Sequence, residues 1–195
     1  MRRFILTGTP GAGKTAILRQ LELEGFSVVE EAATDVIALE QAKGVSEPWL
    51  DPHFIDKVVN LQRARVVRAE RLPGEVQFHD RSPICTVALA DFLGHPLSDA
   101  VSRELQRLEK ERTYERQVFF VQSPGFITPT EARRISLEEA RHFETVHERT
   151  YRAYGFDLIP IRPGSVPDRV TAIRCALASR QPAPHMPVRA RSWSR

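Results

Sequence analysis

A glycine-rich loop near the amino terminus, residues 8–15 with the sequence GTPGAGKT, constrains the fold of this chain more than any other feature. An apolar run at residues 4–6 precedes the loop, and apolar residues recur at helical spacing after it, at Ile17, Leu18 and Leu21. The pattern G-x-x-x-x-G-K-[ST] between a strand and a helix is typical of a loop that wraps around phosphate groups. A glycine-rich turn that merely joins the two elements is the alternative, and the strand–loop–helix context argues against it. The sequence therefore predicts a nucleoside-triphosphate site.

Each residue type in this loop suits a phosphate chain. Glycine has no side chain, so backbone N–H groups can turn inward and approach the phosphates closely. The helix that begins near Gly13 adds the partial positive charge of its amino terminus. Lys14 is expected to reach the β- and γ-phosphates of ATP, and the Thr15 hydroxyl to bind Mg²⁺. The residues predicted to bind the nucleotide are Gly8, Thr9, Pro10, Gly11, Ala12, Gly13, Lys14, Thr15 and Ala16, together with Arg162 and Pro163 from a later loop.

Length and composition are ordinary for a globular domain. The chain has 195 residues, of which 42% are hydrophobic and 27% charged, enough for one domain with a full core. No apolar run approaches the roughly 18 residues of a membrane span, and the first strand begins too early for a signal peptide, so we expect a cytoplasmic protein. The net charge of +3 is a mild excess that suits phosphate-rich ligands. Cys85 and Cys175 stand in apolar surroundings, which predicts two buried, reduced thiols.

Predicted strands and helices alternate along the chain. The strands are expected at residues 4–6, 26–31, 76–80, 117–122 and 156–161. The helices are expected at residues 13–24, 32–42, 52–72, 83–92, 98–115 and 129–154, with a last one within 163–178. This order predicts an α/β fold, the three-layer sandwich of P-loop NTPases, with a five-stranded, mostly parallel sheet and helices on both faces. Pro160 predicts that the last strand lies at an edge, because proline cannot donate to a central ladder.

The predicted domain covers residues 1–178 and includes a lid around residues 123–140. Residues 179–195 are rich in proline and arginine and lack periodicity, which predicts a flexible basic tail. A basic arm for nucleic acid is the alternative for that tail. The arginines are scattered along the chain and do not form a concentrated patch, which argues against nucleic acid as a partner. A monomer and a homodimer both stay open.

Charged residues at the carboxyl ends of the strands are the candidates for chemistry, because ligands bind there in parallel α/β sheets. Asp80 can hold Mg²⁺ or accept a proton from an attacking hydroxyl, with a solvated loop aspartate as the alternative. Arg81 suits bidentate contact with a phosphate or carboxylate, or else a structural salt bridge. Glu31 ends the second strand, where it could orient or deprotonate an acceptor. Glu30 could do so instead, because the strand register is open.

Two further groups of residues have less distinctive patterns. Arg133 and Arg134 follow the fourth strand, near the start of a predicted helix. They could close over the phosphates and neutralise charge on the transferred group, or they could form a charged helix face with nearby glutamates. His79, His142 and His147 have no companions at metal-ligand spacing, so we expect solvated or core histidines.

Several segments resemble the small AAA-domain ATPases of the nucleoside- and nucleotide-kinase group, which includes ribosylnicotinamide-kinase-like proteins. They are the loop at residues 8–15, VVEEAATDVI, PWLDPHFIDKVVNLQ, FHDRSP and ARRISLEEARHFETVHERTYRAYGFDLIPI, and the resemblance spans nearly the whole of residues 1–178. The triplet Asp80-Arg81-Ser82 is similar to the Asp/Glu-Arg-Ser/Tyr motif of deoxynucleoside and thymidylate kinases. Arg133 and Arg134 fall where such kinases carry lid arginines. Thr34 departs from the family, whose members often carry arginine at that position.

The motifs and the resemblance together favour a small-molecule kinase. Such an enzyme would transfer the γ-phosphoryl group of ATP to a nucleoside, a nucleotide or another small hydroxyl or phosphate acceptor. The predicted catalytic residues are Lys14, Asp80, Arg133 and Arg134, with Thr15 and Asp80 at Mg²⁺ and Glu31 and Arg81 at the acceptor. Two alternatives stay open, a nucleotide-driven ATPase or switch acting on a protein partner, and a polynucleotide 5′-end kinase. The chain lacks the Asn/Thr-Lys-x-Asp motif of GTPases.

Overall fold

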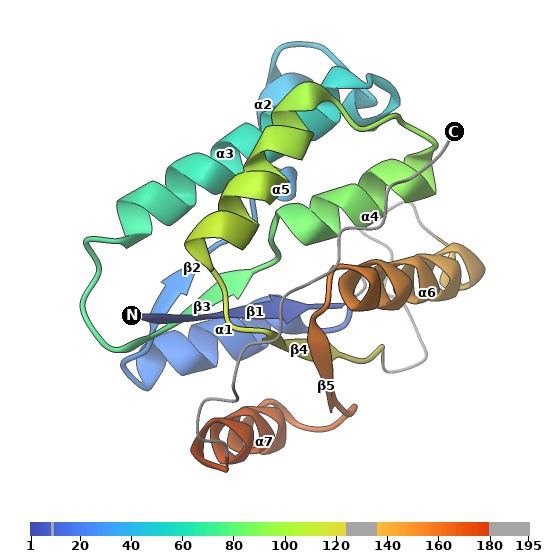
Figure 1. The fold of residues 1–195 in the computed structure, drawn as a ribbon. Helices are drawn as coiled ribbons and strands as arrows, with labels where there is room; N and C mark the ends of the chain where they lie inside the picture. Colours follow the sequence, from blue (N-terminus) through green and yellow to red (C-terminus); the bar gives the residue numbers. More distant parts are fainter. Residues whose placement is uncertain (9, 124–135, 180–195) are drawn as a thin grey trace.

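A parallel sheet forms the centre of the computed structural model, which describes residues 1–8, 10–123 and 136–179 (Figure 1). Within these residues the sheet has five strands in the order β2-β3-β1-β4-β5, and every pair of neighbours is parallel. The strands are β1 (Arg2–Thr7), β2 (Ser27–Val29), β3 (Val76–Asp80), β4 (Gln117–Val121) and β5 (Asp157–Ile161). The predicted α/β fold is confirmed, and the sheet is parallel throughout. Pro160 lies in β5, at the edge where it was expected.

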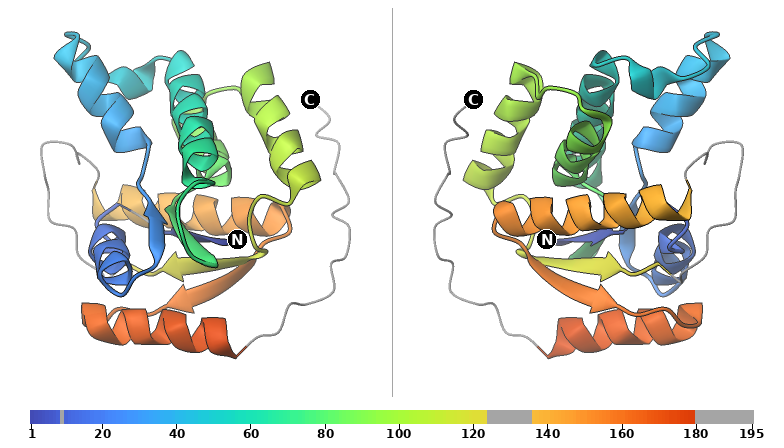
Figure 2. Two further views of the ribbon diagram at one scale, coloured as in Figure 1. Left: turned by 90° about the vertical axis from the view of Figure 1, so that its left-hand side faces the viewer. Right: turned by 90° about the vertical axis from the view of Figure 1, so that its right-hand side faces the viewer.

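Helices cover both faces of the sheet (Figures 1 and 2). The helices α1 and α7 lie on one face, and α3 to α6 lie on the other side. The bounds are α1 (Lys14–Leu23), α2 (Ala33–Ala42), α3 (His53–Ala69), α4 (Pro83–Leu93), α5 (Asp99–Glu111), α6 (Leu137–Ala153) and α7 (Val166–Ala178), with a 3₁₀ turn η1 (Pro48–Leu50) before α3. The chain thus forms three layers, as the alternation of elements predicts.

The core follows the alternation of side chains along the strands. Phe4 and Leu6 of β1 are fully buried against α1 and α7, whereas Ile5 packs on the opposite face with residues of α4 and α6. Phe4 contacts the rings of Phe78 and Phe119 on its two neighbouring strands, with ring centroids 6.1 and 5.7 Å apart. The first strand is therefore fixed between two others, and the loop that follows it starts from a rigid position.

Two expectations from the sequence are wrong in detail. The helix predicted from residue 129 begins at Leu137, because Ser136 caps it in a reciprocal box with Glu139. Cys85 is buried as expected, but Cys175 is exposed. The buried face of α7 passes through Arg169, Val170 and Ile173, and a residue two positions further lies on the opposite side of a helix.

Some predictions concern residues outside the described part of the chain. They are Thr9, the lid arginines Arg133 and Arg134, and the tail from residue 180 onward. Within the described residues, no helix is long and apolar enough to span a membrane.

Candidate active site

The phosphate-binding loop connects β1 to α1 at the carboxyl edge of the sheet. Gly8 has a φ of 136°, and a Cβ there would lie 2.2 Å from the carbonyl oxygen of Val121. Gly13, the N-cap of α1, has a φ of 85° in the left-handed region. No other residue type fits the first position, and others would be strained at the second. The loop geometry therefore requires the glycines that the motif contains.

Lys14 begins α1 and turns back over the loop. Its Nζ donates a hydrogen bond to the carbonyl oxygen of Gly8 at 3.1 Å, and its side chain is buried. Burial lowers the pKa of Lys14 to about 8, and the nearby Arg81 lowers it too, while Asp80 and Glu31 partly offset these effects. A negative group at this point would therefore restore the ordinary affinity of the lysine for its proton.

Of the two glutamates that follow β2, Glu31 is the one that faces the site. Its Oε1 lies 2.5 Å from Nε of Arg81, and its Oε2 accepts a hydrogen bond from Oγ1 of Thr34 at 2.7 Å. Burial alone would raise the pKa of Glu31, but the charges of Arg81 and Lys14 bring it below the ordinary value. Glu30 points away and forms an ion pair with Arg19. The sequence left open which of the two glutamates faces the site, and in the structure it is Glu31.

Arg81 is held in a restrained conformation beside Glu31. Its φ of 68° is in the left-handed region, which non-glycine residues seldom adopt. The backbone N–H of Arg81 donates to the carbonyl oxygen of Leu6 at 3.0 Å, and Nη1 lies 3.2 Å from Nε2 of the buried His147. Glu31, which follows β2, and His147 of α6 therefore position the guanidinium, and Leu6 of β1 holds the backbone. Such backbone strain is common at functional sites.

Asp80 is a buried carboxylate with one unpaired oxygen. It is 5% exposed, and its Oδ1 has no hydrogen-bond partner among the described residues. Burial raises the pKa of Asp80, while the charge of Lys14 opposes that rise. An unpaired, buried carboxylate oxygen near a phosphate-binding loop fits a Mg²⁺ ion, and Thr15 adds a hydroxyl at the same cavity. The described residues contain no cluster of three or more acidic, histidine or cysteine ligands, so phosphate and water oxygens would complete the coordination.

One cavity of about 750 Å³ connects these groups. At one end it is lined by the phosphate-binding loop, and Glu31, Asp80 and Arg81 lie along its wall. The other end, called here the apolar chamber, is lined by Ile37, Trp49, Phe54, Leu89, Phe92 and Phe143. A second ligand could therefore lie next to the terminal phosphate of a bound nucleotide.

Comparisons with known proteins agree with this geometry. A family model described as AAA domain matches residues 3–169. The chain belongs to this AAA-domain family. The family resemblance predicted from the sequence is thus confirmed. A search of curated proteins gives no match.

Solved structures share the fold of this AAA domain at low sequence identity. A deoxyadenosine kinase from M. mycoides with bound dATP matches with a TM-score of 0.61 and 16% identity, over 91% of this chain and 100% of that one. The NadR protein in complex with NAD and AMP-PNP matches at 0.63 and 18%, over 95% of this chain and 52% of that one. Shikimate kinase from Acinetobacter baumannii matches at 0.58 and 15%, over 92% and 94%. At these identities the matches establish the P-loop NTPase fold.

Arg169 of α7 is a residue of the AAA domain that the sequence motifs did not indicate. Its guanidinium donates to three carbonyl oxygens, those of Ala12 at 2.8 Å, Gln122 at 3.0 Å and Arg162 at 3.2 Å. It therefore ties the phosphate-binding loop to the ends of β4 and β5. Arg162 itself is exposed, as is Pro163, and neither lines the cavity, so their predicted contact with the nucleotide stays a prediction.

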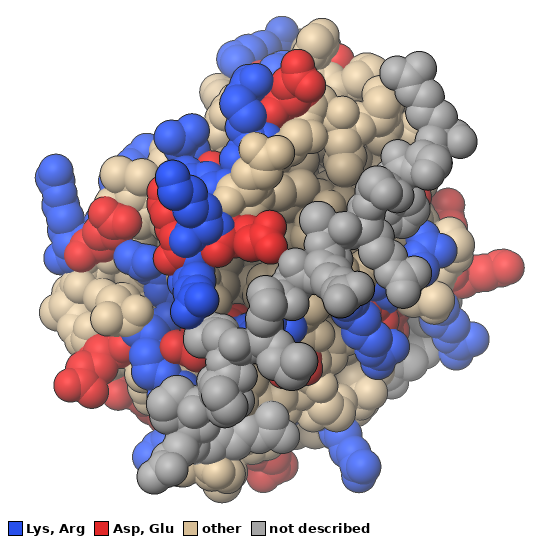
Figure 3. Space-filling model, viewed as in Figure 1, with Lys and Arg blue, Asp and Glu red and all other residues tan. Residues whose placement is uncertain are grey.

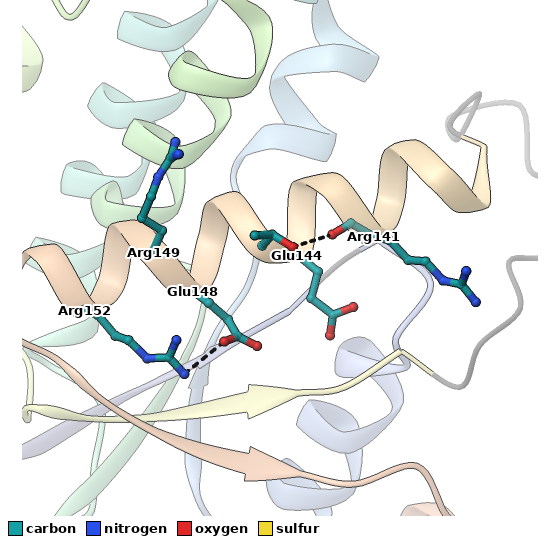
Figure 4. A pocket seen from close by; sticks show the side chains of 6 residues that line it. Arg141, Glu144, Glu148, Arg149 and Arg152 are labelled. Carbon is teal, nitrogen blue, oxygen red and sulfur yellow. Dashed lines mark hydrogen bonds and ion pairs between the residues drawn. The ribbon is translucent and has the colours of Figure 1, made fainter.

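The helix α6 packs against α4 and β5 beside the site. Glu139 and Phe143 line the cavity, and further along the helix the hydroxyl of Tyr151 lies 2.9 Å from Oγ of Ser82 and 2.8 Å from Sγ of Cys85. The outer face of α6 borders another hollow, where Arg152 pairs with Glu148 at 2.9 Å (Figure 4). That hollow is lined by one threonine and five charged side chains, all from α6, and no residue of the phosphate-binding loop lines it.

Proposed function

We propose that this AAA-domain protein is a small-molecule kinase that uses ATP. The observation that carries the proposal is the single cavity that joins a phosphate-binding loop to an apolar chamber, with two carboxylates and an arginine between them. A kinase needs this arrangement, because the acceptor must lie in line with the terminal phosphate and away from competing water. The structural neighbours named kinases support the same reaction class.

The contacts of each residue indicate its role in the proposed reaction. Lys14 would bind the β- and γ-phosphates, because its ammonium group lies at the phosphate-binding loop. Burial lowers its pKa, and a negatively charged ligand would stabilise the protonated form. Asp80 and Thr15 would hold Mg²⁺, which when bound neutralises charge on the phosphates. Glu31 holds Arg81 at the edge of the chamber, where the guanidinium can contact the transferred group or the acceptor.

The proposed reaction moves one phosphoryl group. The acceptor hydroxyl oxygen forms a bond to the γ-phosphorus, the bond between this phosphorus and the bridging oxygen breaks, and ADP leaves. The hydroxyl proton passes to a carboxylate or to water. The carboxylates that line the cavity include Asp80, whose pKa is raised by burial, and Glu31, whose two oxygens already have partners.

Two observations weigh against the alternatives. A chamber lined by aromatic and aliphatic side chains suits a small acceptor better than a segment of a protein partner. On the face shown in Figure 3, basic and acidic side chains are interspersed, whereas a polynucleotide kinase would need a continuous basic channel.

The test is a measurement of ADP formation from ATP and Mg²⁺ across nucleosides, nucleotides, vitamins and other small alcohols. The expected result is slow hydrolysis alone and a large acceleration by a defined set of acceptors, with a phosphorylated product identified by mass spectrometry. The Lys14→Ala variant is the control and should lose the acceleration. ATP hydrolysis that accelerates only with a protein partner, and with no small acceptor, would overturn the proposal.

A further inference from the structure

His147 of α6 is a fully buried histidine with a partner at each nitrogen of its ring. Nδ1 lies 3.1 Å from the carbonyl oxygen of Phe143, one turn earlier in the helix. Nε2 lies 3.2 Å from Nη1 of Arg81. The second contact connects the histidine to the candidate active site, because Arg81 lines the cavity there.

These two contacts determine which nitrogen of the ring carries the proton. A backbone carbonyl oxygen can only accept a hydrogen bond, and a guanidinium can only donate one. Nδ1 of His147 must therefore be protonated and donate to Phe143, and Nε2 must be unprotonated and accept from Arg81. Burial holds the pKa of His147 well below its ordinary value, and the charge of Arg81 lowers it further, so the ring is neutral as this pattern requires.

The contact with His147 also affects the ion pair between Glu31 and Arg81. A guanidinium and a carboxylate often form a bidentate pair, in which two N–H groups face both oxygens. Here Oε1 of Glu31 faces Nε of Arg81 at 2.5 Å, but Oε2 accepts a hydrogen bond from Thr34 at 2.7 Å. The bond from Nη1 to His147 fixes the plane of the guanidinium on its other side. Both charged groups thus have a second contact that competes with a bidentate pair.

A second side chain of α6 holds the same turn of the chain. The hydroxyl of Tyr151 lies 2.9 Å from Oγ of Ser82, which follows Arg81 and is the N-cap of α4. Tyr151 and Ser82 are both buried. Residues four positions apart lie on the same face of a helix, so His147 and Tyr151 reach this turn from one face of α6. The helix therefore holds both the guanidinium of Arg81 and the residue next to it.

We propose, building on the kinase function above, that His147 is a positioning residue, which as the neutral Nδ1–H tautomer keeps the guanidinium of Arg81 directed into the cavity. Arg81 then stays available to the transferred phosphoryl group or to the acceptor, and does not turn onto Glu31. His147 itself does not line the cavity, so it acts through Arg81.

NMR spectra of the full chain labelled with ¹⁵N-histidine test the tautomer without requiring turnover. The chain has six histidines, and the signals of His147 are those that the variant His147→Gln lacks. We expect a proton on Nδ1 and none on Nε2. The Nε2 signal should also move in Arg81→Met, because that variant removes the donor. A proton on Nε2, or an Nε2 signal that stays in place in Arg81→Met, would overturn the inference.

A double-mutant cycle tests whether His147 acts through Arg81. The measured quantity is ADP formation from ATP and Mg²⁺ with the small acceptor that accelerates it most in the screen above. His147→Leu cannot accept a hydrogen bond and should lower kcat by about tenfold to a hundredfold, with ADP affinity unchanged. In the Arg81→Met background, the same replacement should lower kcat by less than about threefold, because the contact is already lost. An unchanged kcat in His147→Leu, or equal losses in both backgrounds, would refute the positioning role.

Two further variants separate positioning from folding. His147→Gln keeps a side-chain oxygen that can accept from Arg81, so kcat should stay within about threefold of that of the parent chain. Val146→Ala is the matched control, because Val146 is buried in the same helix and does not line the cavity. It should lower the melting temperature and leave kcat unchanged. If Val146→Ala lowers kcat as far as His147→Leu does, the histidine serves only the stability of α6 and the proposal is wrong.

The two kinds of measurement distinguish this inference from the proposed function. If the parent chain phosphorylates no small acceptor, the kinase proposal fails, and the NMR signals still decide whether His147 holds Arg81. If the parent chain is a kinase and His147→Leu is as active, the kinase proposal stands and the positioning role is wrong.

Discussion

Replacing Arg169→Met should loosen the phosphate-binding loop without touching any residue that lines the cavity. Methionine fills a similar volume but cannot donate to the carbonyl oxygens of Ala12, Gln122 and Arg162. A hydrogen bond from a charged donor contributes about 1.5–3 kcal/mol, and water can partly replace each lost bond near the surface. We therefore expect a loss of about 2–4 kcal/mol in the free energy of unfolding. For a domain of this size the melting temperature should fall by about 4–16 °C.

The local consequence should be a weaker nucleotide complex. The carbonyl of Ala12 lies in the phosphate-binding loop, so losing its partner releases the segment that presents N–H groups to the phosphates. ADP affinity, measured by calorimetry well below the melting temperature, should fall tenfold or more, and the KM for ATP should rise more than kcat falls. Arg169→Lys should show most of this loss, because a single ammonium group cannot reach three diverging carbonyl oxygens.

Arg174→Met is the matched control on the same helix. Arg174 is exposed and pairs with Glu24 at 3.1 Å, so its removal should change the melting temperature by little and ADP affinity not at all. If Arg169→Met lowers the melting temperature as expected but leaves ADP affinity unchanged, Arg169 serves only the fold. If neither quantity changes, its three contacts contribute nothing and the reasoning is wrong.

Four further outcomes are expected. Asp80→Asn should leave the melting temperature unchanged or slightly higher, because burial disfavours the charge, and it should lower turnover about a hundredfold or more. A lower melting temperature with normal specific activity would contradict this. ATP affinity should be about tenfold lower at pH 9 than at pH 7, because Lys14 loses its proton above about pH 8 and binds the phosphates only when it is charged. An ATP affinity that calorimetry finds unchanged between these pH values would count against the role of Lys14. Thr34→Val should lower kcat several-fold at constant ADP affinity, since the side chain fixes Oε2 of Glu31 but not the nucleotide; steady-state kinetics decide this. ATP should compete better than GTP in a displacement titration, as the guanine motif is missing.

The sequence was sufficient for the fold and for the nucleotide end of the site. A glycine-rich loop between a strand and a helix has few structural solutions, and the alternation of strands and helices implies a parallel sheet. The edge position of Pro160 follows from the missing N–H alone. These features depend on local backbone chemistry, which a sequence pattern records directly.

The remaining features depend on tertiary contacts that no local pattern records. The choice between Glu30 and Glu31 required the register of β2 against β3, and Arg169 acts on carbonyl oxygens far away in the sequence. The start of α6 was recorded in the sequence as Ser136 followed by Glu139, and the longer helical periodicity obscured it. The exposure of Cys175 required the exact rotation of α7, which a mixed apolar segment does not define.

The central position of β1 has a consequence for the order of folding. This strand pairs with β3 on one side and β4 on the other, although it precedes both of them along the chain. Gly8 then packs against the carbonyl of Val121, so the phosphate-binding loop lacks its neighbour until residues 117–121 have been added. Such non-local pairing slows folding and leaves the early chain with unpaired strand edges. A nucleotide can therefore assist only a late step, after the fourth strand has joined the sheet.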